Sequence, residues 1–184
     1  MLQNGYLASG YSDGIINIWQ AIDGTLIRTL KGHTDSVYSL AVLQNDYLAS
    51  GSLGEIKIWD TNDGSLIRTL TGHTKWVYSL AVLNNGYLAS GSWDDSIKIW
   101  NVINGSLIRT LTGHNDSVRS LAVLPNGDLA SGSADKSIKI WNTDTGSLIR
   151  TLAGHTDTVY SLAAFKNGYL ASGSLDTTIK VWMV

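Results

Sequence analysis

The sequence predicts an all-β protein built from one short unit that is repeated along the whole chain. Five tryptophans recur at positions 19, 59, 100, 141 and 182, with spacings of 40, 41, 41 and 41 residues. Four Gly-His pairs recur in step with them, and each histidine precedes a tryptophan by 26 or 27 residues. These residues include every histidine and all but two of the 7 tryptophans, so the repeat organises the composition. No segment shows helical periodicity, and the local signals are those of β-strands.

The unit that starts at Gly72 contains four strand signals separated by turn signals. The first strand is an apolar run, and the third alternates strictly between apolar and polar residues, as a half-buried strand does. Four short antiparallel strands cannot bury their faces alone, so successive units are expected to stack on one another. The predicted strands cover residues 77–83, 87–90, 97–100 and 106–111, and the turns between them cover 84–86, 92–96 and 104–105.

A Gly-His pair followed by a strand ladder and a strand that ends in tryptophan resembles the WD-repeat β-propeller, in which four-stranded blades surround a central channel. The namesake Trp-Asp pair occurs only at Trp59-Asp60. The resemblance covers essentially the whole chain and implies five blades, with the inner strand of the first and the outer strand of the last missing. Three, four, four, four and three strands make 18 in all. The predicted blades are 1–31, 32–71, 72–112, 113–153 and 154–184.

The resemblance implies a structural role for the repeated polar residues. In the family, a hydrogen-bond chain links the tryptophan indole through serine and histidine to aspartate. A buried indole needs an acceptor and a buried imidazole needs partners on both nitrogens, so this interpretation is favoured over catalysis. The residues expected in this network are His73, Ser92, Asp94 and Trp100; His114, Ser133, Asp135 and Trp141; and His155, Ser174, Asp176 and Trp182.

The first two blades depart from this pattern. Blade 2 has His33, Ser52 and Trp59, but its turn is one residue short and lacks the aspartate. Blade 1 has Tyr11 in place of the serine, and its histidine position lies before the start of the chain. Incomplete networks are therefore expected in both blades, together with lower local stability.

Composition argues against several classes of function. The net charge of −2 does not favour a nucleic-acid or membrane-surface protein, and the absence of cysteine excludes thiolate metal sites and cysteine nucleophiles. No apolar run reaches 18 residues and no basic-then-apolar leader opens the chain, which predicts a cytoplasmic protein. No catalytic or phosphate-binding motif occurs, so the expectation is a non-enzyme without cofactor or metal. Arginines on the outermost strands are interpreted as edge protection by charge; they are Arg28, Arg68, Arg109 and Arg150.

Five blades fall short of a closed ring of about seven. An open arc exposes apolar faces and strand edges, which invites association. The chain is a piece of a longer propeller, a small closed ring in which Leu26–Leu30 completes blade 5, or half of a head-to-tail homodimer. The similarity of the internal blades favours the homodimer.

In the family, partners contact the face that carries the Gly-His loops and the turns between the second and third strands. Blade 3 has Trp76 and Trp93 there, beside Lys75 and Asp95, where the other repeats have mostly small residues. The two tryptophans are either a partner-binding anchor or a pair that stack on each other and cover a gap. Arg119 replaces a tyrosine of the other repeats and either pairs with an acidic group at the channel mouth or is solvated.

The leading hypothesis is a non-catalytic protein–protein interaction scaffold that binds a protein partner on the face of the Gly-His loops. The alternative is a self-assembling structural module that forms a closed ring by homo-oligomerisation and has no external ligand. Similarity between the repeats favours the alternative, because specialised propellers diversify their loops. The two additional tryptophans favour the scaffold.

Overall fold

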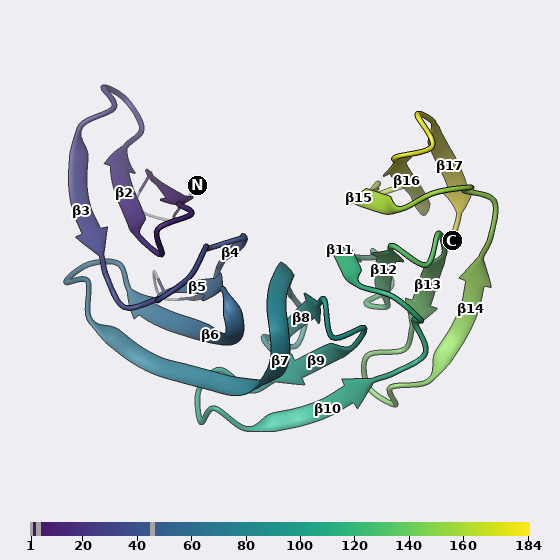
Figure 1. Ribbon diagram of the computed structural model, residues 1–184, viewed down its shortest axis with the longest axis horizontal. Helices are drawn as coiled ribbons and strands as arrows, with labels where there is room; N and C mark the ends of the chain where they lie inside the picture. Colours follow the sequence, from purple (N-terminus) through teal and green to yellow (C-terminus); the bar gives the residue numbers. More distant parts are fainter. Residues whose placement is uncertain (1, 3–4, 45–46) are drawn as a thin grey trace.

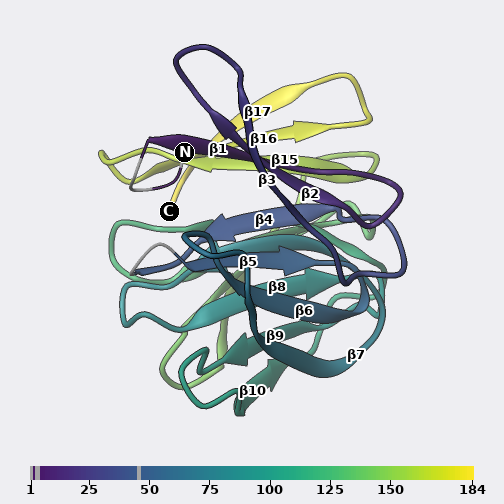
Figure 2. The same cartoon turned by 90° about the vertical axis from the view of Figure 1, so that its left-hand side faces the viewer.

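The computed structural model describes residues 2, 5–44 and 47–184, and this part of the chain contains 17 β-strands and no α-helix. The strands form five blades in an open arc, with blades 1 and 5 on the two sides of the opening (Figure 1). Seen from the side of blade 1, the turns gather on two opposite faces of the molecule (Figure 2). The strands are β1 (Tyr6–Gly10), β2 (Ile16–Gln20), β3 (Leu26–Leu30), β4 (Ser39–Val42), β5 (Tyr47–Gly51), β6 (Leu53–Asp60), β7 (Leu66–Val82), β8 (Leu88–Ser92), β9 (Ile97–Trp100), β10 (Leu107–Leu111), β11 (Val118–Val123), β12 (Leu129–Ser133), β13 (Ile138–Trp141), β14 (Leu148–Leu152), β15 (Val159–Ala164), β16 (Tyr169–Ser174) and β17 (Ile179–Met183).

The described strands number one fewer than predicted because β7 is continuous across the expected boundary between blades 2 and 3. Its first half is the outer strand of blade 2 and its second half is the inner strand of blade 3. The shortened turn of blade 2 explains the fusion: β6 begins at Leu53, which pairs with Trp76 in the middle of β7. Blades 1 and 5 have three strands each, as the sequence predicted.

The hydrophobic core lies between blades. Ile56 and Ile58, from the third strand of blade 2, pack with Leu88 and Trp100 from the second and third strands of blade 3. The same arrangement recurs at the other three blade junctions. Period-2 alternation explains it, because alternate residues of one strand face the preceding and the following blade. Each internal blade therefore depends on both of its neighbours for burial.

The two ends of the arc expose the residue types that the internal blades bury. Ile179 and Val181 of β17 are 79% and 62% exposed, whereas their counterparts in the other blades are buried. At the opposite end, Leu7 of β1 is 44% exposed, whereas its counterparts in the other blades are buried. β3 pairs with β2 of its own blade, so it does not complete blade 5 in a small closed ring. The arc thus ends in two apolar faces that match the two sides of an internal junction.

The outer-strand arginines, interpreted above as edge protection by charge, also join neighbouring blades. Arg68 of blade 2 donates from Nη2 to the Ile103 carbonyl at 2.9 Å and from Nη1 to the Asn104 carbonyl at 3.2 Å, both in a turn of blade 3. Gly105 follows with φ of 81°, and a Cβ there would lie 2.8 Å from the Arg68 Cδ. Glycine is therefore needed twice over, for the left-handed backbone and for the arginine that crosses it. Arg28, Arg109 and Arg150 also donate to carbonyls of the following blade.

Candidate functional site

A buried histidine lies at the centre of a hydrogen-bond chain in each of blades 3, 4 and 5. In blade 4, the Trp141 indole donates to Ser131 Oγ at 2.8 Å, and His114 Nε2 lies 2.7 Å from the same hydroxyl. His114 Nδ1 lies 2.7 Å from Asp135 Oδ2. The indole N–H and both imidazole nitrogens thus have hydrogen-bond partners within the protein. The equivalent residues are His73, Ser90, Asp94 and Trp100 in blade 3, and His155, Ser172, Asp176 and Trp182 in blade 5.

The serine in each chain is not the predicted one but the serine two residues earlier. Ser133 Oγ instead donates to the Asp116 carbonyl at 2.8 Å and accepts from the Asp135 N–H, so it fixes the Gly-His loop and the adjacent turn. Residues two apart on a strand share a face, which is why spacing alone did not separate the two serines. A signal was present, because only the earlier serine occurs in all five repeats. The corrected assignments replace Ser52, Ser92, Ser133 and Ser174 by Ser50, Ser90, Ser131 and Ser172.

Blade 2 has a complete chain, contrary to the prediction. Glu55 Oε1 lies 2.8 Å from His33 Nδ1, while Ser50 Oγ contacts His33 Nε2 and accepts from the Trp59 indole. The longer glutamate side chain compensates for the turn that is one residue short. Burial lowers the pKa of His33 despite the nearby carboxylate, which keeps the imidazole neutral near pH 7.

Blade 1 lacks the histidine but keeps part of the arrangement. The Trp19 indole donates to Ser9 Oγ at 2.7 Å, and the Tyr11 hydroxyl lies 3.3 Å from the same oxygen. Tyr11, noted in the sequence as a defect, thus contacts the oxygen that binds histidine elsewhere. Of the two predicted weak blades, only blade 1 lacks the full chain.

The aspartates of the network respond to burial and to hydrogen bonding in opposite directions. Burial raises the pKa of the Asp135 carboxyl, but hydrogen bonds from His114 and Ser137 outweigh it and hold the pKa well below its usual range. Asp94 behaves in the same way with His73 and Ser96. These carboxylates are therefore ionised hydrogen-bond acceptors at neutral pH.

Acid is expected to destabilise the protein through these aspartates. Because their pKa is depressed in the folded state, their contribution to stability is present above the usual carboxyl pKa of about 4 and is lost as the pH falls below it. We expect the free energy of unfolding to fall between about pH 5 and pH 2, and Asp135→Asn to flatten that dependence. Urea unfolding at several pH values measures it. Asp144→Asn, in an exposed turn, is the matched control for the removal of one carboxylate.

The predicted face of blade 3 carries a stacked tryptophan pair. The Trp76 and Trp93 rings lie 4.9 Å apart at an interplanar angle of 20°. The Trp76 indole donates to Asp35 Oδ1 at 3.3 Å, and Lys75 Nζ lies 5.4 Å from the Trp93 ring centroid. The rings do stack on each other, yet Trp93 remains 37% exposed. Asp95 lies in the same turn with φ of 66°.

Tyrosines that sequence reasoning left out connect this pair to Arg119. Tyr78 stacks on Trp93 with ring centroids 6.3 Å apart, and Arg119 Cζ lies 4.2 Å from the Tyr78 centroid and 5.7 Å from that of Tyr160. The tyrosines share one position of the repeat, at the start of the inner strands (Tyr38 directly precedes β4), and this shared position was the available signal. We call the continuous surface the aromatic band; it consists of Tyr38, Trp76, Tyr78, Trp93, Arg119 and Tyr160.

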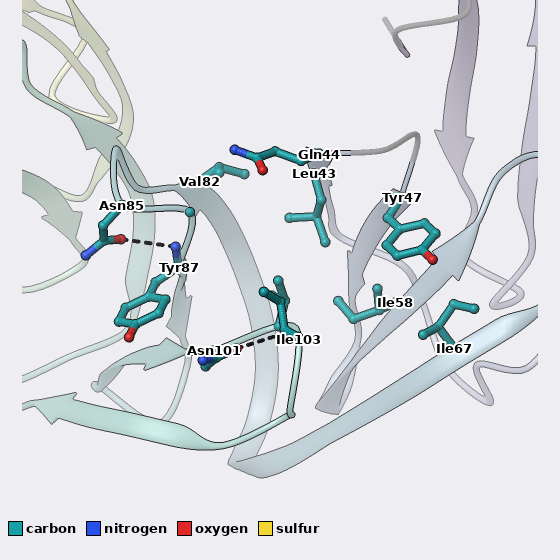
Figure 3. A pocket seen from close by; sticks show the side chains of 12 residues that line it. Leu43, Gln44, Tyr47, Ile58, Ile67, Val82, Asn85, Tyr87, Asn101 and Ile103 are labelled. Atoms are coloured by element: carbon teal, nitrogen blue, oxygen red, sulfur yellow. Dashed lines mark hydrogen bonds between the residues drawn. The ribbon is translucent and has the colours of Figure 1, made fainter.

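A separate cavity of about 490 Å³ opens between blades 2 and 3, at the end of the strands opposite the Gly-His loops. Figure 3 shows apolar side chains around it, among them Leu43, Ile58 and Ile103. The Asn85 and Asn101 side chains accept hydrogen bonds from backbone N–H groups of their own turns. Among the described residues that line the cavity there is no histidine and no carboxylate.

Within the described ranges, no group of three or more His, Cys, Asp or Glu side chains is placed to hold a metal ion. The same residues include no helix long and apolar enough to cross a membrane.

Known proteins share both sequence and architecture with this chain. A segment of 31 residues, 17% of the chain, is 52% identical to Mitochondrial division protein 1 of two Saccharomyces cerevisiae strains and covers 4% of that protein. The crystal structure of the computationally designed Ika8 protein matches with a TM-score of 0.88 and 34% identity, over 100% of this chain and 57% of that one. The WD40 β-propeller domain of Doa1 matches with a TM-score of 0.88 and 30% identity, over 97% of this chain and 60% of that one. The family model for the WD domain, G-beta repeat, matches residues 24–60, 64–101, 105–142 and 146–183, and the chain therefore belongs to the WD40 family.

Proposed function

We propose that this chain is a non-catalytic protein–protein interaction scaffold whose partner binds blade 3 on the face of the Gly-His loops. The Trp76–Trp93 stack carries the proposal, because it holds a large apolar surface rigid at the protein surface. Lys75, Asp95 and Arg119 complete the proposed partner-binding residues around it. Aromatic and arginine side chains dominate the energetics of protein interfaces, and a pre-stacked pair loses little conformational entropy on binding. WD40 propellers commonly serve as interaction scaffolds, which agrees with this assignment.

The test uses ligands selected from a phage-displayed library of random short peptides against the intact chain. The double variant Trp76→Ser/Trp93→Ala installs residues that other repeats have at these positions, as in Ser117 and Ala134. We expect it to weaken ligand binding by about 30-fold or more, since each buried aromatic anchor contributes about 2 kcal/mol. Leu175→Ala, at the Trp93 position of blade 5 and 58% exposed, is the matched control. Equal binding by the double variant and the wild type would contradict the proposal.

Head-to-tail self-association is the second candidate function, and the exposed ends of the arc favour it. Ile179 and Val181 at one end and Leu7 at the other are the residue types that pack together at every internal junction. Light scattering after size exclusion should then give about twice the 19.8 kDa of one chain. Val181→Lys should restore the single-chain mass. A mass of one chain for the wild type at all concentrations would rule this candidate out.

A further inference from the structure

Arg119, on the inner strand β11, is a cation for which the described residues supply no acceptor. Among the described residues its guanidinium has no hydrogen bond and no ion pair, and its Nε is buried. The outer-strand arginines differ, because their Nη groups donate to carbonyls of the next blade; Arg68 is one example. Arg119 also stands where Tyr38, Tyr78 and Tyr160 stand in the other repeats. Blade 4 therefore carries a donor from which no described residue accepts a hydrogen bond.

The aromatic band fixes the orientation of that donor. Tyr78 and Tyr160 lie against the guanidinium, with ring centroids 4.2 Å and 5.7 Å from Cζ. A guanidinium stacked on aromatic rings keeps its N–H groups pointing outward in its own plane, the geometry that a planar carboxylate matches with two parallel hydrogen bonds. Two stacked contacts, from Arg119 to Tyr78 and from Tyr78 to Trp93, link this donor to the tryptophan pair. A ligand can thus use both at once.

The surrounding charges favour a ligand group with a single negative charge. In the turn of blade 3, burial raises the pKa of Asp95, and the carboxylates of Asp116, Asp94 and Asp135 raise it further. Lys75 partly opposes them, and its Nζ lies over the Trp93 ring. One guanidinium carries a single positive charge, which one carboxylate balances, whereas the charge of a dianionic phosphate would exceed it.

We propose that Arg119 is a carboxylate-binding site that receives an Asp or Glu side chain, or the C-terminus, of a peptide partner whose apolar residue packs on Trp93. This inference rests on the proposed interaction face and specifies its ligand. The partner carboxylate would bind the Nη groups of Arg119 at the channel mouth, two stacked contacts away from its apolar anchor.

The selected peptides described above provide the test. We expect Asp or Glu at one fixed distance from an apolar or aromatic residue in most of them. Arg119→Tyr, which restores the residue of the other repeats, should weaken their binding about tenfold or more, and Arg119→Lys should recover part of it. Replacing the acidic residue of the peptide by its amide should cause the same loss in the wild type and no further loss in Arg119→Tyr. Additive losses, or peptides without acidic residues, would overturn the proposal.

A phosphoserine version of the best peptide distinguishes the two sources of negative charge. The carboxylate peptide should bind at least as tightly as the phosphorylated one. Phosphopeptide binding that is tenfold tighter and depends on Lys75 would overturn the carboxylate assignment. If the peptides lose binding with Trp76→Ser/Trp93→Ala but not with Arg119→Tyr, this inference fails while the proposed function stands. If neither variant weakens binding, both fail.

Discussion

Replacing Trp100 by alanine is expected to lower the free energy of unfolding by about 4 kcal/mol. The indole is fully buried and packs with Ile56 and Ile58 at the junction between blades 2 and 3. It also donates to Ser90 Oγ at 2.8 Å. Alanine would leave a large cavity at this junction, and the two blades could do little to close it. The hydroxyl would also lose the donor that positions it toward the histidine.

Trp19→Ala is the control for this effect. Trp19 has the same position in blade 1 and the same hydrogen bond, to Ser9 Oγ at 2.7 Å, but it is only partly buried because no described blade precedes it. We expect a loss of about 1 kcal/mol there. Urea unfolding of both variants measures the difference. Similar losses would mean that stability resides within blades and not between them.

Gly132→Ala is expected to cost about 2 kcal/mol through steric overlap. A Cβ at this position would lie 2.7 Å from Val159 Cγ1 and 3.3 Å from the Val159 carbonyl oxygen. Val159 is buried in the core of the next junction, so it cannot move without opening that core. The glycine is thus required by the close approach of blades 4 and 5.

Gly173→Ala in blade 5 is the control that distinguishes this steric effect from an intrinsic preference of the strand for glycine. It is the same residue of the repeat, but the nearest atom to its added Cβ would be Ser161 Cβ at 3.9 Å. Gly173→Ala should therefore change the unfolding free energy by no more than about 0.5 kcal/mol. Thermal unfolding of the two variants gives the comparison, and a loss at Gly173 as large as that at Gly132 would contradict the steric explanation.

The repeat made the fold predictable because each period carries the same strand and turn signals, and errors in one unit are corrected by the others. The His114–Asp135 contact followed from the resemblance and from the needs of a buried imidazole. Ser131 was missed because it shares a strand face with Ser133, so spacing alone does not show which serine contacts the histidine. Glu55 was missed because spacing does not show that a longer side chain can reach the histidine from a shorter turn. Contacts between blades were equally hidden.

The proposed interaction face was also only partly predictable from the sequence. The two tryptophans stood out because they break the repeat, and so did Arg119. That they join through Tyr78 into one band could not be read from the sequence, because it depends on how far apart the inner strands of neighbouring blades lie. Repetition predicts what a unit contains, and the packing of units determines which of its residues meet.

Hydrogen–deuterium exchange of the chain with and without a selected peptide ligand tests the central claim most directly. If the ligand binds the face of blade 3, exchange should slow in residues 72–78 and 90–95, with a smaller effect around Arg119. Protection confined to the ends of the arc, in β1 or β17, would contradict the claim and would identify the ligand as a mimic of a neighbouring blade.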